Sequence, residues 1–269
     1  MTDRVYGPKL TSSMASSSLT RREMLRLTGT GAAAALFAPH VTFSATAENS
    51  LSPGAIVGNV TAAKVGEKIL RDGGNAIDAA IATAFAAGVV APHQCGIGGY
   101  GGHAVIALAG GKTITAIDFN STAPAAARPD MFPLDANGRV AGNIHTVGWL
   151  AAGVPGTLAG LELALTRYGT RSLRDTLAPV IALCESGAYA PFFRGADPGA
   201  KAAPPGIKTA TATDQRRNAA LTALFKTLAA RNSGETFYRG DLAAKIAAAF
   251  KQHGGLVTTA DLAAYRARE

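Results

Sequence analysis

The glycine-rich segment at residues 96–101 contains residue types that could hold a dinucleotide, because it matches the pattern Gly-x-Gly-x-x-Gly. Such a site needs a strand before the glycines and a helix after them, so that the pyrophosphate meets the N-terminus of the helix. Here the pattern predicts an apolar helix before the glycines and a strand after them. The nearest acidic residue in the required region, Asp118, closes a predicted hairpin instead of a βαβ unit. We therefore interpret the segment as a tight backbone turn, and the sequence predicts no cofactor.

The histidines and cysteines form no recognisable metal or nucleophile motif. The histidines are His40, His93, His103, His145 and His253, and no two of them have the spacing of a zinc site. For His93, beside the glycine-rich segment, a packing role is favoured over catalysis. Cys95 and Cys184 lack Cys-x-x-Cys spacing, so a disulfide is allowed but not required, and two buried free thiols are favoured. No Gly-x-Ser-x-Gly elbow occurs, so spacing alone predicts neither a metal site nor a complete catalytic set.

The elements that must position these residues follow from hydrophobic periodicity and turn signals. The predicted order is a strand at 55–60, helices from 62 to Gly73-Gly74 and at 76–89, a hairpin at 103–108 and 113–119, and helices at 157–168, 173–186, 217–230, 242–253 and 262–266. Loops are expected at 124–142 and 191–213, where proline and glycine are frequent. This mixture predicts the α+β class, with the sheet antiparallel at least at the hairpin.

The helix predicted at 76–89 is apolar on nearly every side, so it is expected to be buried by several neighbours. Asn75 is expected to cap this helix, with Asp78 near its positive end. A last helix is expected to open at Thr258 with Asp261 three residues on.

Composition and charge narrow the class of protein. The chain has 269 residues, of which 48% are hydrophobic and 16% charged, which is typical of a globular protein. The net charge is +8, but residues 1–47 hold five of the basic and two of the acidic residues. The remaining charge is scattered, without basic runs interleaved with aromatics. The pattern therefore disfavours nucleic-acid binding.

The first residues have the features of an export signal. Arg21 and Arg22 precede a mildly apolar stretch at 27–37, and Ala45-Thr46-Ala47 supplies a small-x-small cleavage site. The apolar stretch is shorter than the ~20 residues of a membrane span, so no stable membrane anchor is expected. The sequence predicts a twin-arginine-type signal at 1–47, a mature part at 48–269, and a periplasmic or secreted location.

Several stretches resemble the large subunit of gamma-glutamyltranspeptidases. They are EKILRDGGNAIDAA at 67–80, continuing through 88–99, then DF at 118–119 with TAPAAA and PDMF to 132, then GVPGTLAG at 153–160, and finally segments at 237–240 and 254–265. The resemblance extends over most of residues 52–269, which makes it more specific than any single motif.

The resemblance implies an N-terminal nucleophile hydrolase-like αββα sandwich, of which this chain holds an incomplete, large-subunit part. In that family a precursor cleaves itself, and the new N-terminal Thr of the small subunit attacks a gamma-glutamyl amide with its own amine as base. The acyl group then passes to water or to an amino acid. The implied activity is that of a gamma-glutamyltransferase or glutathione hydrolase, and the implied partner is a small-subunit segment.

The sequence departs from the family in two ways. It ends at Glu269 without a Thr-Thr-His type processing site, since Thr258-Thr259-Ala260 reads as a helix start. No catalytic residue is therefore assigned, and the chain alone is expected to be inactive. The second departure is Asn120, which stands at the position of an Arg that holds the α-carboxylate of the substrate, with Ser121 where an acidic residue is common. Asn120 is the one substrate-binding residue predicted, and glutamyl selectivity is expected to be weakened and to improve in Asn120→Arg.

An alternative from another class remains open. The chain could be a non-enzymatic binding module, or a decayed gene product, that keeps the large-subunit scaffold without its chemistry. The DNA downstream would separate the two hypotheses, because a small-subunit reading frame there favours the enzyme.

Overall fold

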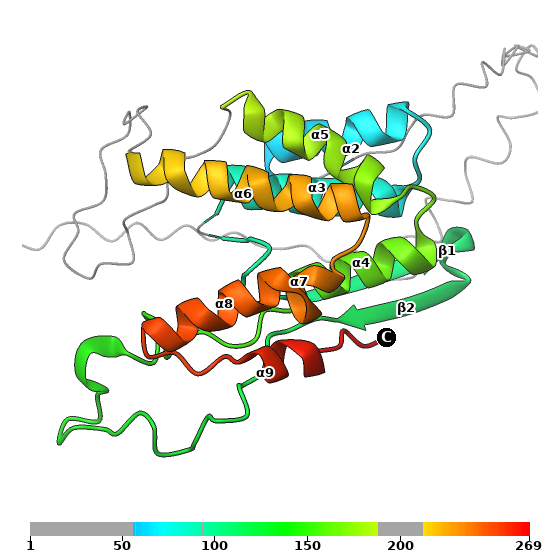
Figure 1. Ribbon diagram of the computed structural model, residues 1–269. Helices are drawn as coiled ribbons and strands as arrows, with labels where there is room; N and C mark the ends of the chain where they lie inside the picture. Colours follow the sequence, from blue (N-terminus) through cyan, green and yellow to red (C-terminus); the bar gives the residue numbers. More distant parts are fainter. Residues whose placement is uncertain (1–55, 57, 93, 188–211) are drawn as a thin grey trace, which may run out of the picture. The chain divides into compact units, whose positions relative to one another are not determined.

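The computed structural model describes residues 56, 58–92, 94–187 and 212–269 (Figure 1). The chain divides into two units, 1–50 and 51–269, and every described residue belongs to the second. The predicted export signal at 1–47 and its cleavage site, His93, and most of the loop expected at 191–213 lie outside the described residues.

Helix α2 (Val60–Arg71) begins and ends at local signals in the sequence. The side chain of Asn59 accepts hydrogen bonds from the amides of Thr61 and Ala62. The helix ends as the glycine pair predicts, with Gly73 at φ +83° and its amide donating to the carbonyl of Leu70. The strand expected at 55–60 is wrong for residues 58–60, because the Asn59 cap starts a helix where the β-branched residues had indicated a strand.

Helix α3 (Ala76–Val90) carries the predicted capping box at Asn75 and Asp78. Asp78 is completely buried, and its carboxylate also accepts the hydroxyl of Thr170 at 2.6 Å and the amide of Arg171 at 3.1 Å. Burial alone would raise the pKa of Asp78, but the hydrogen bonds from Thr170, Asn75 and Arg171 outweigh it and lower the pKa. This carboxylate therefore fastens the start of α3 to the loop between the next two helices.

The rest of α3 is buried as its apolar composition predicts. It packs against α2, α4 (Thr157–Tyr168) and α5 (Leu173–Glu185). Helix α6 (Ala212–Arg231) packs against α5, and Phe225 of α6 meets Phe85 of α3 edge to face, with ring centroids 5.8 Å apart. Figure 1 shows α2, α3, α5 and α6 grouped together, with α4 between this group and the hairpin.

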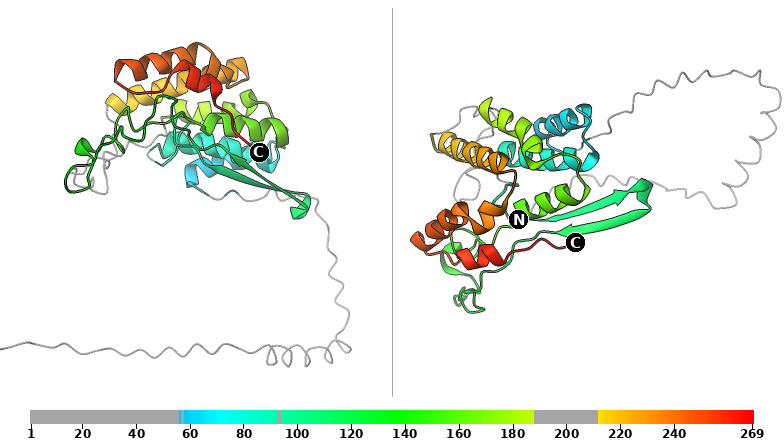
Figure 2. Two further views of the ribbon diagram at one scale, coloured as in Figure 1. Left: turned by 90° about the horizontal axis from the view of Figure 1, so that it is seen from below. Right: turned by 45° about the vertical axis from the view of Figure 1, so that its right-hand side comes forward.

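The predicted hairpin is present. Strands β1 (His103–Leu108) and β2 (Thr113–Asp118) are antiparallel, with His103 opposite Asp118, and a short 3-10 turn at Ala109–Gly111 joins them. One face of the hairpin buries Ile106 and Ile117. Helix α4 lies beside the hairpin (Figures 1 and 2) and contacts β2. On the other face, Val105 is 73% exposed and Ile114 is 68% exposed.

The C-terminal helices are α7 (Glu235–Arg239), α8 (Asp241–Gln252) and α9 (Thr259–Ala264). The predicted start at Thr258 and Asp261 is confirmed as a capping box. Helix α7 was not predicted, because five residues are too few for a periodic pattern. After α9 the chain returns to the hairpin, where Arg268 pairs with Asp118.

Helices packed around an antiparallel hairpin give the α+β class that the sequence predicts. The cysteines are both free thiols. Cys184 is buried in α5, but the prediction that both are buried is wrong for Cys95, which lies in an exposed turn after α3.

Candidate functional site

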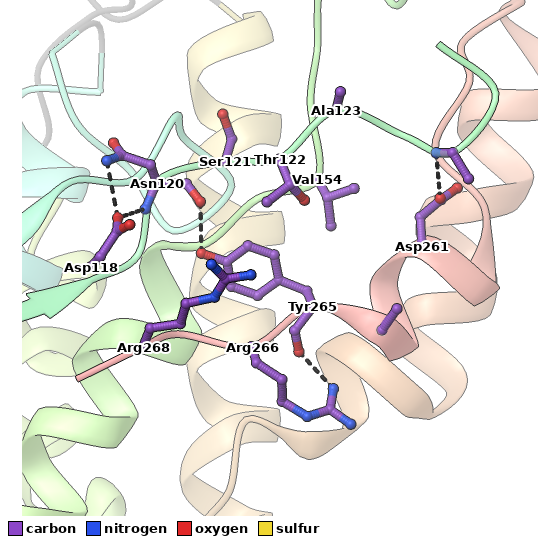
Figure 3. Close-up of a pocket in the computed structure, with 12 residues that line it drawn as sticks. Asp118, Asn120, Ser121, Thr122, Ala123, Val154, Asp261, Tyr265, Arg266 and Arg268 are labelled. Atoms are coloured by element: carbon purple, nitrogen blue, oxygen red, sulfur yellow. Dashed lines mark hydrogen bonds between the residues drawn. The ribbon is translucent and has the colours of Figure 1, made fainter.

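A pocket of about 600 Å³ opens where the end of β2 meets the segment after α9 (Figure 3). One wall is formed by the chain from Asp118 to Ala125, which includes Asn120, Ser121 and Thr122. The opposite wall is formed by Asp261 of α9 and by Tyr265 and Arg268 beyond it. The pocket therefore joins segments that are more than a hundred residues apart in the sequence.

Alternation along the strand positions the first wall. Successive residues of an extended chain point to opposite faces, so the buried ring of Phe119 lies opposite the exposed side chain of Asp118. The ring rests on the surface of α4 at Gly160. A Cβ added there would overlap Cβ and Cγ of Phe119, and one added at Gly156 would overlap the Phe119 carbonyl and the Tyr265 hydroxyl. The glycines of the 153–160 stretch thus allow β2 to approach α4 closely.

Tyr265 of the opposite wall contacts the first wall and packs against Tyr238. The hydroxyl of Tyr265 donates to the carbonyl oxygen of Asn120 at 2.7 Å. Its ring stacks on Tyr238, with centroids 5.8 Å apart, and the Tyr238 hydroxyl donates to the carbonyl of Pro155 at 3.0 Å. Burial raises the pKa of both phenols, which stay neutral donors near pH 7.

Asn120, the substrate-binding residue predicted from the sequence, lies in this pocket. Its side-chain nitrogen donates to Oδ1 of Asp118 at 3.0 Å and lies 2.8 Å from Nε2 of His103. A carboxylate can only accept, so Asp118 fixes which end of the amide faces it. His103 then accepts through Nε2 and carries its proton on Nδ1 in the neutral ring. Both N–H groups of the Asn120 amide are engaged.

Asp118 keeps its negative charge at neutral pH. The hydrogen bond from the backbone amide of Asn120 lowers the pKa of Asp118 most, and the side-chain hydrogen bond from Asn120 and the charge of Arg268 lower it further. Asp261 is similarly engaged, since its carboxylate accepts from the amide and hydroxyl of Thr258 and from the amide of Ala125. Both carboxylates of the pocket are therefore held by neighbours in the chain.

The sequence did not identify Arg268 or Tyr265 as parts of the site. Their contacts with Asp118 and Asn120 span about 145 residues or more, and no local spacing signals them. No group of three or more His, Cys, Asp or Glu in the described part of the chain could hold a metal ion. The arrangement suits a small polar ligand, because it offers hydroxyls, charges of both signs and a few small apolar side chains such as Val154.

Comparisons with known proteins identify relatives of this chain. Residues 62–269 match the sequence profile of the family described as Gamma-glutamyltranspeptidase. The chain is 35% identical to the Glutathione hydrolase proenzyme of Pseudomonas sp. (strain A14), in an alignment that covers 90% of this chain and 44% of the relative. It therefore spans less than half of that relative's length.

Solved structures show the same likeness. The Helicobacter pylori gamma-Glutamyltranspeptidase superposes with a TM-score of 0.62 and 36% identity, covering 80% of this chain and 64% of that one. The cephalosporin acylase from Bacillus halodurans gives a TM-score of 0.59 and 28% identity, covering 77% of this chain and 41% of that one.

Proposed function

Because the chain belongs to the gamma-glutamyltranspeptidase family, we propose that it is the large-subunit part of an amide acyltransferase or hydrolase. Its fold is an incomplete N-terminal nucleophile hydrolase fold of mixed helices and sheet. The observation that carries the proposal is the pocket at Asp118–Thr122, because three stretches that resemble the family line it: the end of β2 and the residues after it, Val154 of the 153–160 stretch, and Tyr265 after α9.

The proposed substrate is a small molecule with a gamma-glutamyl or related amide bond, such as glutathione. The name of the Pseudomonas relative supports glutathione. The name of the Bacillus halodurans structure, a cephalosporin acylase, supports a different acyl group. Asn120 supports a range of acyl groups wider than gamma-glutamyl, because both N–H groups of its side-chain amide are already hydrogen-bonded and none is left for a substrate carboxylate.

The proposed nucleophile is a Thr at the start of a small-subunit segment, which this chain does not supply. The charged groups that line the pocket bind and orient the substrate in this proposal, and among the described residues none of them forms a nucleophile–base pair. We propose that the small-subunit segment packs on the exposed face of the hairpin around Val105 and Ile114. Without that segment the nucleophile and its oxyanion donors are both missing, and one such donor alone contributes ~10²–10³ in rate.

Co-expression tests this function. The full chain is expressed with the small-subunit segment of the Pseudomonas sp. (strain A14) relative, and hydrolysis of gamma-glutamyl-p-nitroanilide is followed. We expect activity from the pair and none from either part alone. The control replaces the N-terminal Thr of the small segment with Ala. A pair that co-purifies but hydrolyses no amide would favour the alternative of a non-enzymatic binding module.

We also propose that residues 1–47 direct export and are then removed. The twin arginines and the Ala45-Thr46-Ala47 site support this. Over the residues that the structure describes, no helix is long and apolar enough to cross a membrane. N-terminal sequencing of the exported protein should begin at Glu48, and an intact Met1 on a protein retained in the cytoplasm would contradict the proposal.

A further inference from the structure

We propose that Arg268 binds the carboxylate of the acyl substrate in this pocket, in the role for which Asn120 lacks both charge and free donors. The inference deepens the proposed function and rests on it for the identity of the substrate. It concerns a residue whose place in the site follows from backbone pairing and not from any sequence motif.

Backbone pairing brings Arg268 to the pocket. The amide of Asp118 donates to the carbonyl of Arg268 at 2.7 Å, and the amide of Arg268 donates to the carbonyl of Asp118 at 2.9 Å. Residues paired in this way project their side chains from the same face of a sheet. Since Asp118 and Asn120 share that face, the guanidinium of Arg268 lies on the same side as both. Figure 3 shows its side chain running from the end of the chain toward Asn120 and Tyr265.

The guanidinium of Arg268 is not used by the fold. Among the described residues it makes no hydrogen bond or ion pair, although its charge acts on Asp118 and Tyr265. Arg266 differs, because its Nη1 donates to the carbonyls of Ala263 and Tyr265 at 2.7 Å and 2.6 Å. Of the two cations that line the pocket, Arg268 is therefore the one with donors available to a ligand.

The ligand that fits these donors is a carboxylate. A guanidinium presents parallel N–H groups that match the two oxygens of a carboxylate, a geometry that an amide cannot reproduce. The acidic groups of the pocket accept hydrogen bonds from other parts of the chain, Oδ1 of Asp118 from Asn120 and Asp261 from Thr258, and neither forms an ion pair with Arg268 among the described residues. The hydroxyls of Ser121 and Thr122 line the same space and can donate to the ligand as well.

Binding to the full chain tests this assignment without requiring catalysis. Ligand-observed NMR measures the affinities for L-glutamate and for 4-aminobutyrate, which is the same molecule without its α-carboxylate. We expect the wild-type chain to prefer L-glutamate. Arg268→Gln should lose about tenfold in L-glutamate affinity, equal to about 1.4 kcal/mol, and leave 4-aminobutyrate unchanged. Arg268→Lys should keep part of the preference because it keeps the charge.

The matched control is Arg128→Gln, which removes an equally charged side chain that is 73% exposed, pairs with Asp130 and does not line the pocket. It should bind both probes as the wild type does. A melting curve confirms that Arg268→Gln is folded, which is expected because its side chain holds nothing in the fold. An unchanged preference in Arg268→Gln, or no preference in the wild type, would overturn the inference. Binding that depends on Arg268, without hydrolysis by the co-expressed pair, would overturn the proposed function instead.

Discussion

The amide of Asn120 is oriented by its neighbours in a way that decides what it can offer a ligand. Its nitrogen faces Asp118 and His103, both of which act as acceptors, so its free atom is the oxygen. An oxygen turned toward a bound carboxylate repels it. The residue that stands at the family's arginine position is thus not a weaker version of an arginine, because it presents the opposite polarity.

A double-mutant cycle at residues 120 and 268 tests how the positive charge of the pocket is shared. Asn120→Arg should raise kcat/KM for gamma-glutamyl-p-nitroanilide in the co-expressed pair, because it adds a guanidinium that can donate to both oxygens of the substrate carboxylate. The gain should be only a few-fold with Arg268 present, since a second cation nearby adds repulsion, and about tenfold or more in Arg268→Gln. Asn120→Gln, which adds length without charge, is the control. Equal gains in the two backgrounds would show that the two positions act independently.

At the scale of elements, Asp78 shows how a buried charge stabilises a junction between helices. Asp78→Asn should destabilise the fold by about 2–4 kcal/mol, because its amide would face donors from Thr170 and Arg171 that then lose their acceptor. The lowered pKa of Asp78 means that its contribution is present above the unfolded pKa of about 3.9 and is lost as pH falls through the lower folded pKa. The difference between the two proteins in urea midpoint, followed by circular dichroism, should therefore shrink below about pH 4. Asp130→Asn, at an exposed loop position, should change little at any pH.

The close approach of β2 to α4 yields a second element-scale prediction. Alanine normally stabilises a helix relative to glycine by about 0.5–1 kcal/mol. Gly160→Ala should instead destabilise the fold by about 1–3 kcal/mol, because the new methyl group overlaps Cβ and Cγ of Phe119, which lie close to the backbone and cannot move aside. Gly98→Ala, where a Cβ would meet no atom within 4 Å, is the control. A Gly160→Ala protein as stable as the wild type in urea would mean that β2 does not rest on α4 in this way.

Local signals explain which elements could be predicted from the sequence. Helix α3 has a capping box and a continuous apolar run, helix α4 follows a glycine, and the hairpin turns at a glycine pair, so the predictions agree with the structure to within a residue or two. The strand prediction was wrong at 58–60 because one capping side chain, Asn59, outweighed the β-branched pattern. The site was predictable only at Asn120, through resemblance. Arg268 and Tyr265 reach it through long-range pairing, which composition and spacing do not encode.

For the whole molecule, the exposed face of the hairpin is the feature that most needs an explanation. A two-stranded hairpin is marginal unless its apolar face is covered, and in the described part of the chain helices cover only the face that holds Ile106 and Ile117. Val105 and Ile114 remain mostly exposed on the other face. The curated relative is more than twice as long as the aligned part of this chain, so we infer that the remaining part of such a protein covers this face. The chain alone is therefore expected to bind a hydrophobic dye and to associate with itself.

Negative charge introduced on this face should block docking of the small-subunit segment and leave the fold intact. In the double variant Val105→Asp and Ile114→Asp, both side chains are exposed, so the stability of the chain should change by no more than about 0.5 kcal/mol per site. Docking of the small-subunit segment would bury both carboxylates without partners, a cost of several kcal/mol that should abolish co-purification and activity. Dye binding and self-association of the chain alone should fall as well, measured by fluorescence and size-exclusion chromatography. Leu134→Asp, 67% exposed on a loop, is the control and should leave all of these unchanged. A double variant that still captures the small segment would place the docking surface elsewhere on the chain.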